Sequence, residues 1–217
     1  MVDLIIKKIV NNPVSSNCFI IYNLENAGCL IVDPGSENPS EINLFLNSKG
    51  LVPEYIILTH HHFDHIWAVN YFVERFKCLI IASKTCSLKI KDSKLNLSLY
   101  YNDLGFSTYP ADLFVEDLNY IFDWNGARIE IYSSTGHSDS CISLLIENNL
   151  FSGDALIENV KPVTTLPSGN KECIRKTYIM YQELLLRKKK ITVYPGHGKI
   201  FDLNILNLQL KEKNGKV

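Results

Sequence analysis

The chain has 217 residues, of which 46% are hydrophobic and 21% are charged. This is the composition of an ordinary globular protein, and it excludes a disordered or collagen-like chain. The 22 Lys and Arg residues nearly balance the 23 Asp and Glu residues, for a formal net charge of −1, so we expect no nucleic-acid partner. We also expect no membrane contact, because no apolar run approaches the roughly 20 residues of a membrane helix.

The cysteines and the first ten residues both indicate in which cellular compartment the protein is expected. The opening sequence MVDLIIKKIV carries Asp3, Lys7 and Lys8 within its apolar stretch, which is unlike a signal peptide. Six cysteines are dispersed along the chain, and none forms a CxxC pair. This pattern favours reduced thiols over a disulfide framework, so we predict a cytoplasmic protein.

Short apolar runs and amphipathic stretches follow one another along the chain. Strands are predicted over residues 4–10, 18–22, 29–32, 55–58, 78–82, 128–132, 142–146 and 191–194. Helices are predicted over 39–49, 64–76 and 171–187, where apolar side chains recur at helical spacing. This mixture predicts an α/β fold in which helices cover sheets. No repeat or linker interrupts the chain, so we expect one domain.

Residues 83–124 have no firm periodicity and are rich in Leu, Asn, Asp, Tyr and Ser. We expect a loop region with short helices, long enough to form a wall over a site. Tyr100 and Tyr101 lie in this region. Either they donate hydrogen bonds to a substrate oxygen or, as is commoner for tyrosine, they pack in the wall.

Histidines gather at the ends of predicted strands. Four of the six lie within the sequence THHHFDH, directly after the run 55–58. His137 and His197 also follow strand-like runs, each beside a glycine, and Asp154 ends a fourth run in the sequence LFSGD. Polar groups at the carboxyl ends of strands converge on one crevice in sheets of this kind. We therefore expect these side chains to meet.

The spacing of these residues predicts metal binding. In His60-x-His62, alternate side chains of an extended segment face the same way, so both imidazoles can bind one ion. Asp64 and His65 begin the next helix and can turn toward a second position. Imidazole and carboxylate ligands suit zinc, and also iron or manganese. Seven candidates are too many for one tetrahedral ion but suit two divalent ions that share a bridging carboxylate. The candidate ligands are His60, His62, Asp64, His65, His137, Asp154 and His197.

Three residues of these motifs have distinct expected roles. Asp64 is our candidate catalytic residue as well as a ligand. His61 alternates away from its neighbours, so we expect a solvent-facing spacer rather than a ligand. Asp33, in the sequence VDPG, is either a plain turn residue or the hydrogen-bond partner of a ligand histidine.

The motif HxHxDH, followed in order by the three later ligand positions, resembles the metallo-β-lactamase superfamily over residues 17–198. The sequences VDPG, FSGD and YPGHG are most similar to its glyoxalase II (hydroxyacylglutathione hydrolase) branch. The resemblance implies a four-layer αβ/βα sandwich. It also implies two metal ions, with zinc favoured over iron or manganese, and a hydroxide between them as the nucleophile. The first ion would be held by His60, His62 and His137, and the second by Asp64, His65 and His197, with Asp154 bridging.

The chain departs from that branch in three places. Ser134-Thr135-Gly136 precedes His137 where the family often has Thr-Pro-Gly, and residues 162–167 read PVTTLP where the branch has Gly-Arg-Thr-Asp before Leu-Pro. Full-length glyoxalase II enzymes continue into a helical domain that binds glutathione, whereas 20 residues follow His197 here (217 − 197). We therefore expect a single metallo-β-lactamase-fold domain over residues 1–217, with no C-terminal glutathione-binding helical domain.

Leaving-group chemistry favours a thioester substrate. A thiolate, whose parent thiol has a pKa of about 8.5, departs without prior protonation. An amine needs a general acid, and every histidine but His61 is already a candidate ligand. We therefore predict a hydrolase for a small thioester or ester. The alternatives are a persulfide dioxygenase-like iron enzyme and a lactone or ester hydrolase of the same superfamily. A nuclease would need a basic surface, which the net charge disfavours.

Overall fold

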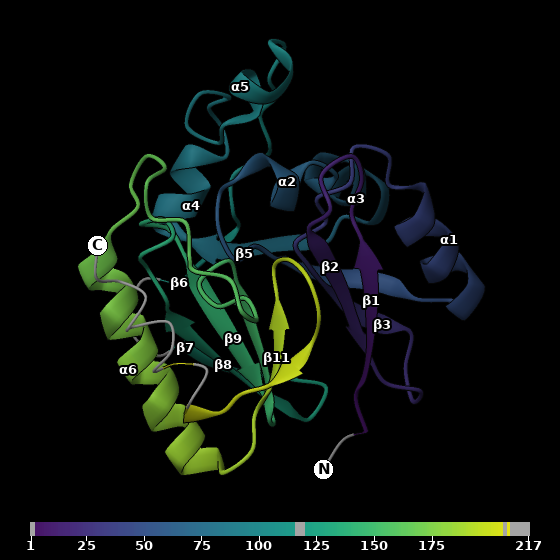
Figure 1. The fold of residues 1–217 in the computed structure, drawn as a ribbon. Helices are drawn as coiled ribbons and strands as arrows, with labels where there is room; N and C mark the ends of the chain where they lie inside the picture. The colour runs from purple at the N-terminus through teal and green to yellow at the C-terminus, as the bar shows by residue number, and fades with distance from the viewer. Residues whose placement is uncertain (1–2, 116–119, 206–207, 209–217) are drawn as a thin grey trace. The chain divides into compact units, whose positions relative to one another are not determined.

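The structure, a computed structural model, describes residues 3–115, 120–205 and 208. The chain divides into two compact units, Met1–Glu116 (unit 1) and Asp117–Val217 (unit 2). Within the described residues each unit holds one six-stranded sheet (Figure 1). The single domain over residues 1–217 stays a prediction. None of the helices in the described part of the chain combines the length and apolar content needed to cross a membrane.

Unit 1 forms a mixed sheet in which the strands follow chain order from β1 to β6. The first three strands are antiparallel neighbours, and β3 to β6 are parallel. Its elements are β1 (Ile5–Val10), β2 (Asn17–Tyr22), β3 (Gly28–Val32), α1 (Ser40–Lys49), β4 (Val52–Ile57), α2 (Phe63–Ile66), α3 (Val69–Phe76), β5 (Leu79–Ser83), α4 (Lys84–Lys89), α5 (Ser98–Asn102) and β6 (Leu113–Val115).

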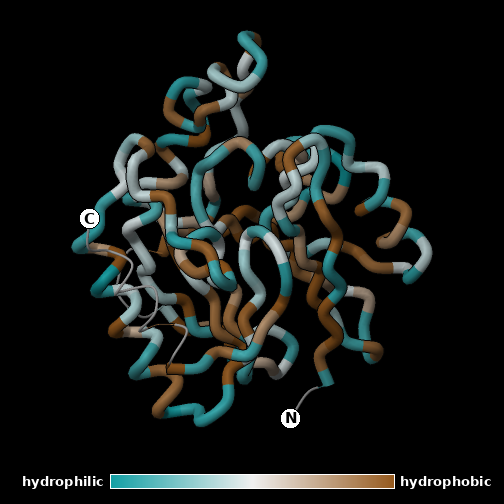
Figure 2. The backbone as a smooth tube through the Cα atoms, viewed as in Figure 1, coloured by the Kyte–Doolittle hydropathy of each residue, from teal (hydrophilic) through white to brown (hydrophobic). Residues whose placement is uncertain are grey.

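The core of unit 1 explains this order of elements. Strands β2 and β3 are buried along their whole length, so the sheet is covered on both faces there. Ile42 and Leu46 of α1 and Val69 and Phe72 of α3 are fully buried in the same cluster as the strand side chains. Burying each such side chain stabilises the fold by about 1.5–3 kcal/mol. Apolar colouring runs along these strands (Figure 2).

The helix predicted over residues 64–76 is broken, which corrects the sequence-based expectation. In a continuous helix the Ala68 amide would bond to the Asp64 carbonyl. Here the Ala68 amide donates to the Pro34 carbonyl at 2.9 Å, and the Asp64 carbonyl accepts from the Ser16 hydroxyl. The chain therefore forms two helices, α2 and α3, because tertiary hydrogen bonds replace the helical ones at this point.

Unit 2 forms a second mixed sheet, in the order β12-β11-β10-β9-β8-β7. Only β10 and β11 pair in parallel; the other neighbours are antiparallel. Its elements are β7 (Tyr120–Trp124), β8 (Ala127–Ser133), β9 (Ile142–Ile146), β10 (Asn149–Gly153), α6 (Lys171–Lys188), β11 (Thr192–Pro195) and β12 (Phe201–Asp202). Helix α6 lies along this sheet (Figure 1). Its Tyr178, Tyr181 and Leu185 belong to the same buried cluster as Leu145, Leu150 and Val193 of the strands.

The eight predicted strands are all present, with ends that differ by up to three residues. Four strands were not predicted: β6, β7, β10 and β12. Residues 83–124 contain the expected short helices α4 and α5, and also β6 and β7. These strands are short or flanked by polar residues, so apolar periodicity does not mark them. All six cysteines are free thiols, as predicted.

Candidate metal centre

In unit 1, the ligand sequence begins where β4 ends. His62 has extended backbone angles (φ −67°, ψ 142°), and α2 starts at the next residue. The extended segment turns the rings of His60 and His62 the same way, so that His60 Nε2 and His62 Nδ1 lie 3.1 Å apart. This confirms the alternation expected from His-x-His.

The hydrogen bonds around Thr59 determine which nitrogen of His60 carries its proton. The Thr59 hydroxyl donates to Asp33 Oδ2 at 2.6 Å and lies 3.1 Å from His60 Nδ1. A hydroxyl that has used its proton accepts from the next neighbour, so His60 Nδ1 carries the hydrogen. The lone pair of His60 is then on Nε2, the atom that faces His62. Two ring nitrogens that converge in this way suit a divalent cation.

Asp33, in the turn after β3, forms hydrogen bonds with Thr59 and His65 of the ligand sequence. Its Oδ1 accepts from the Thr59 amide at 2.8 Å, and its Oδ2 lies 2.9 Å from His65 Nδ1. Asp33 is 1% exposed and has a φ of 53°. Because the carboxylate fixes the Nδ1 proton of His65, the Nε2 lone pair points toward Asp64, whose Oδ2 is 3.5 Å away. Of the two interpretations of Asp33, the structure confirms the hydrogen-bond partner.

The ligand helix α2 is held against the turn that contains Asp33. A Cβ atom on Gly35 would lie 1.6 Å from the Asp64 carbonyl oxygen, so only glycine allows this approach. The Ser16 hydroxyl, which donates to that carbonyl, accepts from the Asn11 side chain at 2.8 Å. Asn11 and Ser16 were not predicted as part of the site, and Gly35 was noted only as part of the VDPG turn. Asn11 and Ser16 lie in the loop between β1 and β2, where polar residues are ordinary, so the sequence carries no signal for their contacts.

His61 is not the solvent-facing spacer that was expected, because it is 2% exposed. Its ring lies 4.7 Å from that of His62 and 6.4 Å from that of His60. The ligand sequence follows β4, a central strand whose Ile56 and Ile57 are fully buried, so this segment is inside the unit. The expected solvent exposure of His61 was therefore wrong.

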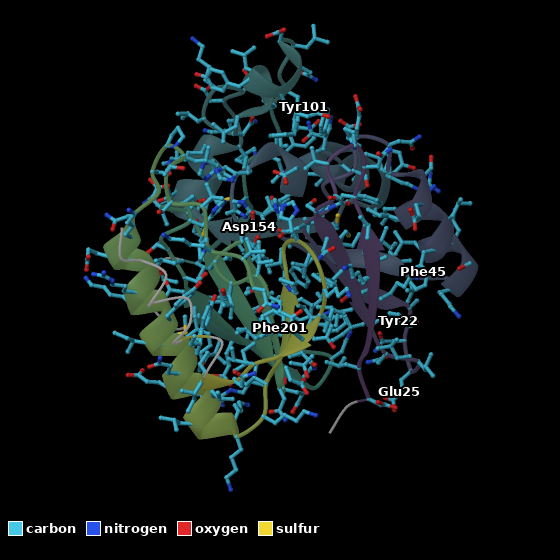
Figure 3. The ribbon with its side chains drawn as sticks, in the orientation of Figure 1. Tyr22, Glu25, Phe45, Tyr101, Asp154 and Phe201 are labelled. Carbon is cyan, nitrogen blue, oxygen red and sulfur yellow. The ribbon has the colours of Figure 1, made fainter. Side chains whose placement is uncertain are left out.

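In unit 2, Asp154 lies between two histidines. His137 Nε2 and His197 Nε2 are 3.6 Å and 3.5 Å from the same oxygen, Asp154 Oδ2. The other nitrogen of His137 is 2.9 Å from the Val163 carbonyl, which accepts its Nδ1 proton and leaves Nε2 directed at Asp154. Asp154 follows β10 at the end of the unit 2 sheet (Figure 3). Val163 belongs to the segment 162–167 that departs from the glyoxalase II pattern.

Backbone contacts bring these three residues of unit 2 together. Because β10 and β11 are parallel, the residues that follow them lie at the same end of the sheet, and the Gly196 amide donates to the Gly153 carbonyl at 2.9 Å. The turn before His137 packs closely against the backbone of α6 at Ile174. A Cβ on Gly136 would lie 2.4 Å from the Ile174 amide nitrogen, and the Gly136 backbone has a φ of 135°.

Each unit therefore carries a group of side chains that suits divalent cations. In unit 1, His60 Nε2 lies 3.1 Å from His62 Nδ1, and His65 Nε2 lies 3.5 Å from Asp64 Oδ2. The chemistry of both groups fits, because ring nitrogens whose rings are oriented by oxygen acceptors lie beside carboxylates. Unit 1 thus holds four of the seven predicted ligands, and unit 2 brings the other three together.

Comparison with known proteins gives a consistent result. A model of the metallo-beta-lactamase superfamily matches residues 11–197. The chain is 29% identical over 196 residues to the probable metallo-hydrolase YqgX of Bacillus subtilis, covering 88% of this chain and 89% of that protein. It is 33% identical over 127 residues to a hydroxyacylglutathione hydrolase of Xylella fastidiosa, covering 58% of this chain and 40% of that enzyme. The crystal structure of the B3 metallo-beta-lactamase BLEG-1 is similar with a TM-score of 0.83 and 25% identity, covering 97% of each chain.

These similarities confirm the predicted α/β fold of the metallo-β-lactamase type. Together with the histidine and aspartate groups they support a metal-dependent hydrolase with a dinuclear metal site. The family match covers well over half of the chain and runs across both ligand groups. This chain belongs to the metallo-β-lactamase superfamily.

Proposed function

We propose that the protein hydrolyses a small thioester with two divalent metal ions, most simply zinc, held by seven side chains. The ligands are His60, His62, Asp64, His65, His137, Asp154 and His197, as the sequence predicts. One observation carries the proposal: in each unit a histidine has its Nδ1 proton fixed by an oxygen acceptor, Asp33 for His65 and Val163 for His137. Such contacts orient metal-binding imidazoles.

The family match supports the joint action of the two groups, because one family model spans residues 11–197 and so contains all seven ligands. Ions bound there would acidify water and polarise a carbonyl. Asp64 and Asp154 would supply two negative charges, which leaves the site able to receive the negative charge that develops on a carbonyl oxygen. We assign to Asp64 the further role of holding the proton released when water adds to the substrate.

The thioester preference rests on leaving-group chemistry and on one relative. The six histidines comprise five proposed ligands and the buried His61, so no histidine is left as a general acid for an amine. A thiolate departs without one. The 33% identity to a hydroxyacylglutathione hydrolase over 58% of this chain supports the same substrate class. Water and the thioester give a carboxylic acid and a thiol.

Metal analysis joined to a substrate panel tests the proposal. We expect about two zinc ions per chain after reconstitution, and hydrolysis of a lactoyl thioester that stops on chelation and returns with zinc. The Asp64→Asn variant should lose activity by about 10²-fold or more. Asp112→Asn, which alters an exposed carboxylate of unit 1 that bonds to the Ile80 amide, is the matched control and should retain activity.

Two results would replace the proposal. One iron per chain with oxygen consumption on a persulfide substrate would indicate the dioxygenase. Cleavage of lactones by the zinc-loaded enzyme, with no turnover of any thioester, would indicate the lactone hydrolase. Loss of bound metal in both His60→Ala and His197→Ala would support joint action of the two units, and unchanged metal content in either would argue against it.

A further inference from the structure

An aromatic cluster borders the metal ligands of unit 1. The ring of Tyr101 lies 4.8 Å from that of Phe63 and 5.8 Å from that of Trp67, and Phe63 and Trp67 are 5.7 Å apart. Phe106 stacks on Trp67 at 5.0 Å. These four residues, which we call the aromatic wall, are all partly or largely exposed.

The position of the wall follows from the ligand helix. Phe63 is bonded directly to His62 and Asp64, so its Cα is within about 3.8 Å of two proposed ligand residues. Phe63 and Trp67 are four residues apart, which places them on one side of α2, next to the side that carries Asp64. A substrate whose carbonyl sits at these ligands has the wall as its neighbour.

The segment between α4 and β6, residues 90–112, holds the wall in position; we call this segment the excursion. Asn96 is fully buried, and its side chain donates to the Phe106 carbonyl at 2.8 Å. The Asn96 carbonyl accepts from the Phe63 amide at 2.9 Å, which ties the excursion to the start of the ligand helix. The Ser98 hydroxyl accepts from the Phe106 amide at 2.9 Å. The segment that carries Tyr101 is therefore joined to α2 by a backbone hydrogen bond, and Tyr101 itself contacts Phe63 and Trp67 through its ring (Figure 3).

The wall exposes apolar surface without a charged group of its own. Tyr101 is 46% exposed, and its neighbours on the excursion, Tyr100 and Leu104, are 73% and 84% exposed. Contiguous aromatic surface of this kind binds apolar and aromatic groups, whereas the carboxylates and amine of a glutathione moiety need charged partners. The wall thus suits the acyl half of a substrate better than a charged thiol carrier.

We infer that Phe63, Trp67 and Tyr101 select the acyl group, and that the substrate is a thioester of an apolar, ring-bearing or branched acid rather than of a small hydroxy acid. This inference rests on the proposed function, because it needs a carbonyl at the metal ligands. Tyr101 acts through its ring and not through its hydroxyl.

Kinetics with two thioesters of one thiol, N-acetylcysteamine, test the inference on the zinc-loaded enzyme. We expect kcat/KM for the phenylacetyl thioester to exceed that for the lactoyl thioester by about tenfold or more. Tyr101→Ser should remove most of this preference by lowering the phenylacetyl value alone, and Tyr101→Phe should keep it. Tyr100→Ser is the matched control, since Tyr100 makes no ring contact with the wall among the described residues, and it should keep the preference.

The inference is overturned by an equal or better kcat/KM for the lactoyl thioester, by an equal effect of Tyr101→Ser on both substrates, or by loss of the preference in Tyr101→Phe. Any of these, with thioester turnover intact, leaves the proposed function standing.

A binding measurement separates failure of the inference from failure of the proposed function. The chain has two tryptophans, Trp67 and Trp124. Phenylacetate, the expected product, should change the fluorescence of the zinc-loaded protein in a saturable way, and Trp67→Phe should abolish that signal. A saturable Trp67 signal without turnover of any thioester would support the wall and reject the thioesterase. No Trp67 response to phenylacetate in an enzyme that hydrolyses thioesters would reject the wall.

Discussion

The Asp33 carboxylate lies 2.9 Å from Nδ1 of His65 and joins the turn after β3 to the ligand helix α2. The same carboxylate accepts two hydrogen bonds from Thr59, which precedes the first ligand histidine. One buried acidic group therefore orients both ends of the ligand sequence in unit 1. Such contacts keep the metal-facing nitrogens in place before any ion binds.

Replacing Asp33 by asparagine tests this relationship. We expect Asp33→Asn to weaken metal affinity about 10–100-fold, because an amide nitrogen cannot accept the protons that the carboxylate accepts. Asparagine tolerates the left-handed backbone of this residue (φ 53°), so the turn itself is kept. Competition with a chelator measures the affinity. Unchanged affinity would show that Asp33 has no part in the site, and Asp112→Asn again serves as the control.

Gly35→Ala tests the close approach of the turn to α2. The added Cβ would meet the Asp64 carbonyl at 1.6 Å, so the helix must move. We expect a loss of more than about 3 kcal/mol in the free energy of unfolding, measured by urea denaturation, together with weaker metal binding. Gly50→Ala is the matched control: Gly50 has a φ of 64° and open space around it, so only about 1 kcal/mol should be lost. Equal losses in the two variants would contradict the packing argument.

A charge network around the buried carboxylate of Glu130 in unit 2 predicts a pH-dependent stability. Glu130 Oε2 accepts from the Tyr132 hydroxyl at 2.5 Å and from Arg187 at 2.9 Å. Burial alone would raise the pKa of Glu130, but these hydrogen bonds and the charges of Arg187 and Lys188 outweigh it and lower the pKa below 4.5. Because the folded-state pKa is depressed, the stabilisation is present above about pH 4.5 and disappears as the pH falls through the folded-state pKa.

Glu130→Gln should therefore destabilise the protein by about 1–3 kcal/mol at pH 7, and the difference from the parent should shrink in acid. Thermal or urea unfolding as a function of pH measures this. Glu172, which pairs with Arg175 on exposed α6 surface, is the control, and Glu172→Gln should cost no more than about 0.5 kcal/mol. A constant difference between Glu130→Gln and the parent from pH 7 to pH 3 would refute the linkage.

The free thiols predict a simple labelling pattern. Five cysteines are buried, and Cys173 is half-buried. Burial raises the pKa of Cys29 and of Cys141 to about 12, and that of Cys78 to about 11, so these thiols stay protonated and unreactive at neutral pH. We expect one thiol to react with a disulfide reagent in the native protein and six after unfolding. Fast labelling that persists in Cys173→Ser would contradict this assignment.

Local patterns predicted most of the fold and all seven proposed ligands. The strand-like runs are apolar because the central strands are buried on both faces. The ligands follow the ends of strands. Both features can be recognised from residues that are close in sequence. The helix over 64–76 was predicted as continuous because its apolar spacing is helical throughout. Its break depends on Pro34 and Ser16, which are distant in sequence, and no local pattern contains them.

The sequence by itself determined the chemistry of the candidate site: which side chains are imidazole or carboxylate, and which of them share an extended segment. The tertiary structure decided which nitrogen of each ring carries the proton, that His61 is buried, and that Tyr101 stacks on the ligand helix. The type of each side chain and its spacing from its neighbours follow directly from the order of the residues. A proton's position, burial and ring contacts depend on partners that only folding brings within a few ångströms.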